Sequence, residues 1–107
     1  MGARANIALC GILASAVALA VPAPQRQHDL LYLLQQDCGS CHGMTLKGGL
    51  GPALLPANLA GKDDNFLIDT VLEGRLNTAM PPWKSELTRD EVSWLIQQLR
   101  KGINHAE

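Results

Sequence analysis

The sequence has 107 residues, which is enough for one domain, and 47% of them are hydrophobic, as a chain with a buried core requires. Its formal net charge is -1. Because lysine and arginine form no cluster, the sequence argues against nucleic acid and anionic membrane surfaces as partners.

The N-terminal segment, residues 1–20, has the pattern of a secretory signal peptide. Arg4 supplies a positive charge, residues 7–21 are largely apolar, and the small residues around Ala20 fit a cleavage site. The apolar run is shorter than the roughly 20 residues that span a bilayer. We therefore predict export and cleavage near Ala20/Val21, without stable membrane insertion afterwards, and an uncleaved anchor is the alternative.

A short lead-in and a helix follow. Residues 21–27 contain two prolines and are predicted to be extended, with the folded domain over residues 28–103. From about Asp29, leucines recur at helical spacing, and Cys38 continues the same face. Tyr32 lies within this leucine-rich stretch and is expected to pack in the core.

The motif CGSCH, residues 38–42, is the strongest chemical signal in the chain. Two thiols three residues apart, followed directly by an imidazole, are the pattern of covalent haem attachment. Cys38 and Cys41 would each bind one vinyl group of the porphyrin, and His42 would be the proximal iron ligand. The motif therefore predicts one haem c per chain.

The cysteine pair allows three other interpretations. A thioredoxin-like redox centre requires an α/β framework, which the sequence does not indicate. A zinc site requires a second ligand pair, but no cysteine follows Cys41. A disulfide between Cys38 and Cys41 is geometrically poor at such short separation. These three remain as minor alternatives to haem attachment.

The segment after the motif, residues 43–61, is rich in glycine and proline and has no sustained period. It is predicted to be a loop around the haem, with a backbone carbonyl that accepts a hydrogen bond from the second ring nitrogen of His42. Its GGLG stretch does not indicate a phosphate site, because no strand precedes it.

Two further helices are predicted. The first has Asp63 or Asp64 as its cap, ends at Gly74, and places on one face the apolar residues Leu67, Ile68, Val71 and Leu72. The last begins with a capping box, ends at Gly102, and is marked by Thr88, Glu91, Val92, Leu95, Ile96 and Leu99. Both terminal helices are too short to be stable alone, so we expect their apolar faces to meet, with Trp94 in the contact.

Met80 is the best candidate for the second iron ligand. It stands before two prolines on a polar loop, far enough along the chain from His42 to pass over the opposite face of a porphyrin. His28 and His105 are rivals near the ends of the domain, and a pentacoordinate iron is the third alternative. Ligation by histidine and methionine favours electron transfer, because the soft thioether stabilises ferrous iron and leaves no open site.

Together these residues resemble the class I c-type cytochromes, which have CxxCH between an N-terminal helix and a Gly-Pro loop, then a middle helix, a methionine loop and a C-terminal helix. The resemblance covers the chain after the signal peptide. It implies an all-α fold of three to four short helices around one covalent haem c, with crossing terminal helices. It also implies that the Pro52 carbonyl bonds His42 and that Leu54 packs on the haem.

More narrowly, DCGSCHGMTLKGGLGPAL and TAMPPWKSEL are similar to small periplasmic cytochromes called c55x, which accompany the cytochrome cd-type nitrite reductase of denitrifying bacteria. This resemblance implies a periplasmic electron carrier rather than an enzyme, with a quinol-oxidising complex as donor and nitrite reductase as acceptor. The alternatives are a role in maturation of the reductase's special haem and a small-ligand-binding haem protein. Trp83, with Pro81 and Pro82, is a candidate docking patch, and the alternative is that Trp83 packs against the rim of the haem.

Overall fold

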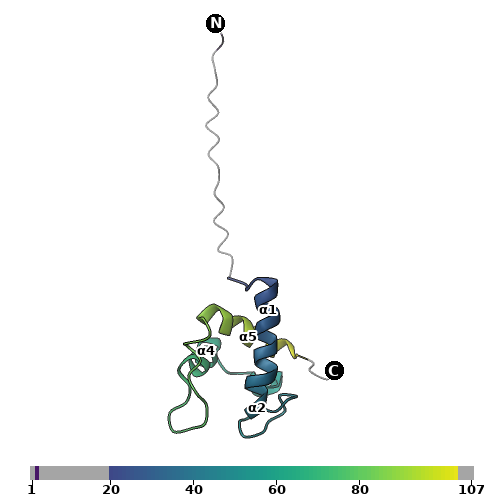
Figure 1. Ribbon diagram of the computed structural model, residues 1–107, viewed down its shortest axis with the longest axis vertical. Coiled ribbons are helices and arrows are strands. Elements are labelled where there is room, and N and C mark those ends of the chain that lie inside the picture. Colours follow the sequence, from purple (N-terminus) through teal and green to yellow (C-terminus); the bar gives the residue numbers. More distant parts are fainter. Residues whose placement is uncertain (1, 3–19, 104–107) are drawn as a thin grey trace.

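The computed structural model describes Gly2 and residues 20–103, and these residues form helices and loops without any strand (Figure 1). The all-α prediction is therefore confirmed. The signal-peptide prediction falls mostly on residues outside the described part and stays a prediction. Nothing in residues 20–103 forms a helix that is long and apolar enough to cross a bilayer.

The N-terminal helix begins earlier than predicted. Helix α1 spans Pro24–Leu33, and the amide of Gln27 already donates to the carbonyl of Ala23 at 2.9 Å. Proline suits the first helical position, where an amide would have no intrahelical partner. The predicted extended lead-in over residues 21–27 is therefore wrong for residues 24–27.

The first helix runs without a break into the CxxCH motif. After α1 come the π-helical turn η1, Leu34–Cys38, and the short helix α2, Gly39–His42. The amide of Gly39 donates to the carbonyl of Leu34, five residues earlier, which defines the wider turn. The chain leaves the helix at Gly43, whose φ of 92° a glycine adopts without strain.

The two later helices have the predicted caps. Helix α4 spans Asp64–Glu73, and the Asp63 carboxylate, rather than that of Asp64, accepts from the amide of Phe66. Helix α5 spans Arg89–Lys101, and its capping box between Thr88 and Glu91 is complete.

One short helix within the predicted loop was missed. Helix α3 spans Pro56–Leu59, again with proline at its start. The guanidinium of Arg100 on α5 donates to the carbonyls of Leu59 at 3.0 Å and Lys62 at 2.6 Å, and to the Asp64 carboxylate. A side chain distant in the sequence thus holds the α3–α4 turn, which local sequence patterns do not reveal.

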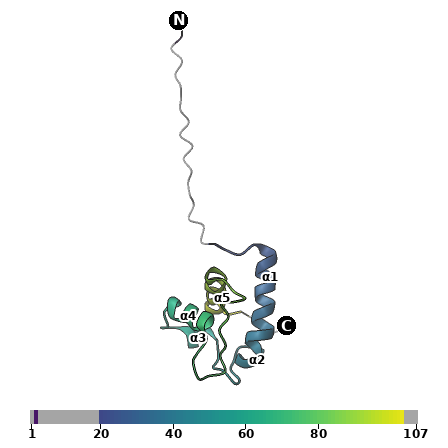
Figure 2. The same ribbon diagram turned by 60° about the vertical axis from the view of Figure 1, so that its left-hand side comes forward.

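The core lies where α5 crosses α1, with α4 packed on the other side of α5 (Figures 1 and 2). Trp94 packs against this core as predicted. Tyr32 does not, because its side chain points away and is 63% exposed. The buried side chains are Leu30, Leu34, Leu46, Leu59, Leu67, Ile68, Leu87, Val92, Leu95, Ile96 and Leu99.

Two loops extend toward the same end of the molecule, away from the start of α1 (Figures 1 and 2). The first contains residues 43–55 and follows the CxxCH motif directly. The second contains residues 74–88, with Met80, and connects α4 to α5. The CxxCH motif in α2 and the two loops that carry the other predicted site residues therefore lie toward this end, which we call the loop end.

Candidate functional site

The two cysteines lie at the end of the long N-terminal helix as free, half-buried thiols. Burial, helped by the Asp37 carboxylate, raises the pKa of the Cys38 thiol to about 11. A thioredoxin-like centre requires a thiol with a lowered pKa, so Cys38 has the opposite property. Within residues 20–103 there is also no group of three His, Cys, Asp or Glu side chains placed to hold a metal ion.

His42 is oriented by the loop that follows it. Its ring nitrogen Nδ1 lies 2.6 Å from the carbonyl oxygen of Pro52. Since a carbonyl can only accept, Nδ1 is the donor, and in the neutral imidazole Nε2 then keeps its lone pair. Histidine ligands of metals are commonly fixed in this way, with one nitrogen donating to the protein and the other free to bind.

Backbone hydrogen bonds hold this loop against the helix end. The amide of Gly48 donates to the carbonyl of His42, and that of Gly51 to the carbonyl of Cys41, both at 2.8 Å. A Cβ atom on Gly51 would lie 2.8 Å from Cε1 and 2.9 Å from Nδ1 of the His42 ring. Gly51 was not among the predicted site residues, although it stands directly before Pro52 in the sequence. Glycine at this position lets the loop backbone lie against the imidazole.

Leu54 lies just beyond this contact and packs partly buried against the core. Its amide donates to the carbonyl of Leu46 at 2.9 Å, which closes the loop. Leu46 is itself buried in spite of a positive φ of 59°. The loop is thus anchored by a leucine side chain and by backbone bonds at both ends.

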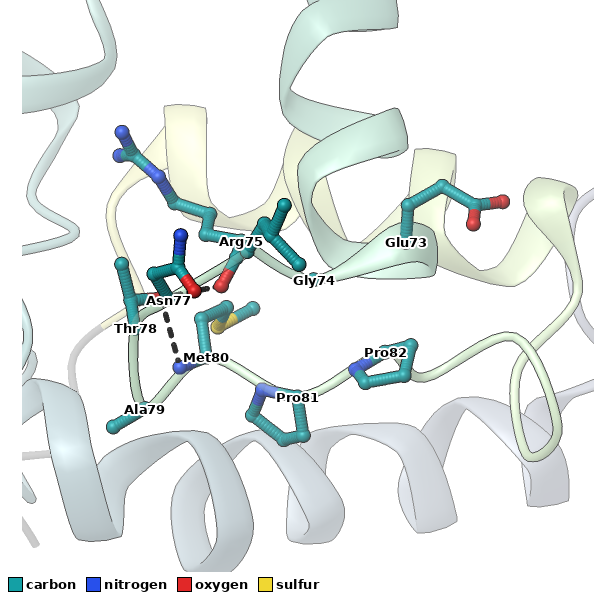
Figure 3. Close-up of a pocket in the computed structure, with 10 residues that line it drawn as sticks. Glu73, Gly74, Arg75, Asn77, Thr78, Ala79, Met80, Pro81 and Pro82 are labelled. Atoms are coloured by element: carbon teal, nitrogen blue, oxygen red, sulfur yellow. Dashed lines mark hydrogen bonds between the residues drawn. The ribbon is translucent and has the colours of Figure 1, made fainter.

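Met80 lies in a separate loop whose ends are drawn together (Figure 3). The amide of Arg75 donates to the carbonyl of Met80 at 3.1 Å. The Thr78 hydroxyl donates to the carbonyl of Arg75 at 2.8 Å and accepts from the amide of Met80 at 3.2 Å. Gly74 permits this approach, because a Cβ there would lie 2.7 Å from the Met80 carbonyl oxygen. The half-buried Met80 side chain points into the hollow inside the loop.

The rival ligands are less well placed. His28 is on α1 with its side chain 79% exposed, 3.8 Å from the Asp29 carboxylate. His105 lies outside the described residues. Met44 is half exposed beside Gly39, close behind the histidine in the chain.

The residues present fit a haem. A fixed imidazole with a free Nε2 and a methionine loop at the same end are the nitrogen and thioether donors that haem iron accepts in electron-transfer proteins. Two unpaired thiols next to the histidine are the groups that thioether attachment requires.

Comparison with known proteins agrees with this chemistry. Residues 25–98 match the family described as "Cytochrome C oxidase, cbb3-type, subunit III". The chain is 53% identical to "Cytochrome c55X" of Pseudomonas aeruginosa over 81 residues, which are 76% of this chain and 68% of that protein. It is 48% identical to "Cytochrome c55X" of Stutzerimonas stutzeri, over 92% of this chain and 88% of that protein.

A solved structure titled "c-type cytochrome NirC" has a TM-score of 0.74 and 53% identity, and the match covers 76% of this chain and 95% of that one. The chain is also 35% identical to part of "Dihydro-heme d1 dehydrogenase" of Pseudomonas aeruginosa, over 83% of this chain and 17% of that protein. Cytochromes of the c type bind haem covalently through a CxxCH motif. The chain therefore belongs to the cytochrome c55X family of c-type cytochromes.

Proposed function

We propose that this protein is a periplasmic monohaem cytochrome that carries single electrons from a quinol-oxidising complex to cytochrome cd-type nitrite reductase. Haem iron, when bound, supplies the one-electron redox change. The names of the similar proteins and the likeness of this chain's loop sequences to those of the c55x cytochromes support this choice of donor and acceptor.

In this proposal the chain's own residues hold the haem. Cys38 and Cys41 supply the two sulfur atoms for thioether bonds, and His42 and Met80 supply the two axial ligands. The observation that carries the proposal is the bond between His42 Nδ1 and the Pro52 carbonyl, which reserves Nε2 for iron. Leu54 lies directly beyond this bond, consistent with a place in the haem pocket.

Exposed apolar side chains at the loop end support a docking role. Leu50 is 79% exposed and Leu76 is 92% exposed, and they belong to the two different loops. Weak redox encounters use small, partly apolar patches of this kind. Pro81 and Pro82 are exposed in the same loop as Leu76, whereas Trp83 packs partly buried against the core. We therefore assign the docking patch to the leucines and prolines rather than to Trp83.

Stopped-flow mixing of the reduced cytochrome with oxidised nitrite reductase tests the carrier function. Because a six-coordinate carrier docks weakly and quickly, we expect oxidation faster than the reductase's own turnover. Oxidation too slow to support turnover would reject nitrite reductase as the acceptor. The haem stoichiometry is tested in the same sample by intact mass, which should exceed that of the polypeptide by one haem.

A second candidate is a role in maturation of the reductase's special haem. The observation that favours it is the similarity to part of a dihydro-haem d1 dehydrogenase, an enzyme that contains a segment resembling this cytochrome. A separate cytochrome of the same kind can accept the electrons that such a dehydrogenase removes from its substrate. A deletion strain distinguishes the two roles, because loss of the carrier leaves the reductase with its special haem, whereas loss of a maturation factor removes it.

A further inference from the structure

Met80, the proposed distal iron ligand, has both of its backbone polar groups bonded within its own loop. Its amide donates to the Thr78 hydroxyl at 3.2 Å, and its carbonyl accepts from the Arg75 amide at 3.1 Å. Pro81 follows it in the sequence, and the residue before a proline is restricted to extended conformations. Three constraints therefore fix the backbone from which the thioether side chain extends.

The Thr78 hydroxyl joins the start of this loop to Met80. It donates to the carbonyl of Arg75 at 2.8 Å and accepts from the amide of Met80 (Figure 3). A hydroxyl group can make both bonds at once, because it is a donor and an acceptor. Removing this one oxygen would therefore release the Met80 amide and weaken the hold on Arg75 together.

A tight turn brings Thr78 to this position. The turn contains residues 75–78 and is closed by a bond of 3.2 Å from the Thr78 amide to the Arg75 carbonyl. Asn77 is the third residue of the turn and has a φ of 62°, which asparagine tolerates better than most side chains do. The backbone thus presents the hydroxyl to both of its partners.

A threonine hydroxyl that bonds to its own backbone is common and often has no further role. Thr70 on α4 is an example in this chain, since its hydroxyl donates to the carbonyl of Phe66 at 2.7 Å. Thr78 differs because its hydroxyl also accepts from an amide, and this amide belongs to the proposed ligand itself. The two threonines therefore allow a matched comparison.

We propose that Thr78 is a positioning residue for Met80, and that its hydroxyl slows the departure of the thioether from the iron. This inference rests on the proposed ligation by Met80. A methionine whose backbone is held can leave only by rotation of its side chain, whereas a methionine on a loose loop can also leave by movement of the backbone. The hydroxyl closes the second route without touching the iron.

The rate at which imidazole binds to the ferric holoprotein tests this role. At saturating imidazole the observed rate reaches a plateau, which equals the rate of Met80 dissociation. Thr78→Val keeps the branched shape and removes the hydroxyl, so we expect the plateau to rise by about three- to tenfold, the factor for one lost hydrogen bond. Thr78→Ser keeps the hydroxyl and should have the plateau of the wild type.

Thr70→Val is the matched control, because the same substitution removes a threonine hydroxyl bond on α4, outside the methionine loop. Its plateau should equal that of the wild type. Equal plateaus in the Thr78→Val and Thr70→Val variants would overturn the role of Thr78. An equal rise in the Thr78→Ser and Thr78→Val variants would also overturn it, since the hydroxyl would then not be the cause.

A measurement on the unaltered holoprotein covers the case in which Thr78→Val fails to fold. In the diamagnetic ferrous state, NMR should show slower hydrogen exchange for the Met80 amide than for the Ala79 amide, which has no acceptor within residues 20–103. Equal exchange, corrected for local sequence, would overturn the inference. A wild-type imidazole rate that rises linearly without a plateau would instead reject the proposed ligation by Met80.

Discussion

At the scale of single residues, the site depends on how closely the backbone approaches the imidazole of His42. Gly51 lies against the ring, and the Pro52 carbonyl accepts a hydrogen bond from the ring nitrogen Nδ1. A side chain at Gly51 must displace either the ring or the loop, because both are in direct contact.

Gly51→Ala is therefore expected to lower the unfolding free energy of the holoprotein by about 1–3 kcal/mol, the usual cost of overpacking. The new Cβ would lie 2.8 Å from the ring, so the bond to Pro52 should also weaken. Denaturant unfolding measures the first effect, and the reduction potential measures the second. Gly61→Ala is the control, because nothing lies within 4 Å of a Cβ there and its cost comes only from a positive φ. Equal potentials in the two variants would contradict the role of Gly51.

Met80→Ala should abolish the weak far-red charge-transfer band of a ferric haem with a thioether ligand. It should also lower the reduction potential and open the iron to small ligands, because the soft donor is removed. Met44→Ala is the matched control, since Met44 is half exposed beside Gly39 and should leave the band intact. A band that persists in the Met80 variant would show that another group binds the iron.

At the scale of the helices, one ion pair joins the two that cross. Arg26 on α1 hydrogen-bonds to Glu91 on α5, which also belongs to the capping box. The bond from Arg26 is the main reason that the pKa of Glu91 lies below its ordinary value of 4.5, against the opposing effect of burial.

Glu91→Gln should make stability less dependent on acid pH. A carboxylate with a lowered pKa in the folded state stabilises the fold above its unfolded-state pKa, and this contribution disappears as the pH falls through the folded-state value. The variant should thus be less stable at pH 7, by about 1 kcal/mol because Arg26 is 41% exposed, and equally stable in strong acid. Glutamine preserves the capping box, so the ion pair alone is removed. Denaturant unfolding from strong acid to pH 7 measures the unfolding free energies of the wild type and the variant. A difference between them that is the same at every pH would contradict the prediction.

The helices also differ in how far they could be predicted from the sequence. The caps of α4 and α5 were predictable because Asp63, Thr88 and Glu91 act within one turn of the chain. Helix α3 was not, because Arg100 holds it from a distant helix. The π turn was hidden because Cys38 falls where an α-helix would place an apolar residue. Tyr32 was misassigned because leucines on both sides obscured its outward direction.

The candidate site was predictable to a different extent. The motif and the family resemblance predicted the two cysteines, both axial ligands and the two pocket residues, and the structure brings His42 and Pro52 together. The ligation by Met80 and the haem contact of Leu54 stay predictions. The contact of Gly51 with the His42 ring required coordinates, because a glycine shows its function only through what lies beside it.

At the scale of the whole molecule, the loop end is the expected docking face. Leu76→Ser should reduce the second-order rate constant of electron transfer to nitrite reductase and leave the reduction potential unchanged, because a side chain that is 92% exposed contributes little to the core. Phe66→Ser is the control, since Phe66 is also exposed but lies near the start of α4, away from the loop. Equal rate losses in both variants would place the contact elsewhere.

The pinned ends of the methionine loop have a consequence for how such proteins diversify. Arg75 and Met80 close the loop, and the amides of Trp83 and Lys84 donate to the carbonyls of Val71 and Leu72 on α4 just beyond it. The segment between these attachments can be lengthened, shortened or exchanged while the helices keep their places. The segment can therefore be replaced as a unit, by evolution or by protein engineering. Such a replacement would alter redox behaviour and the choice of partner and would leave the helices unchanged.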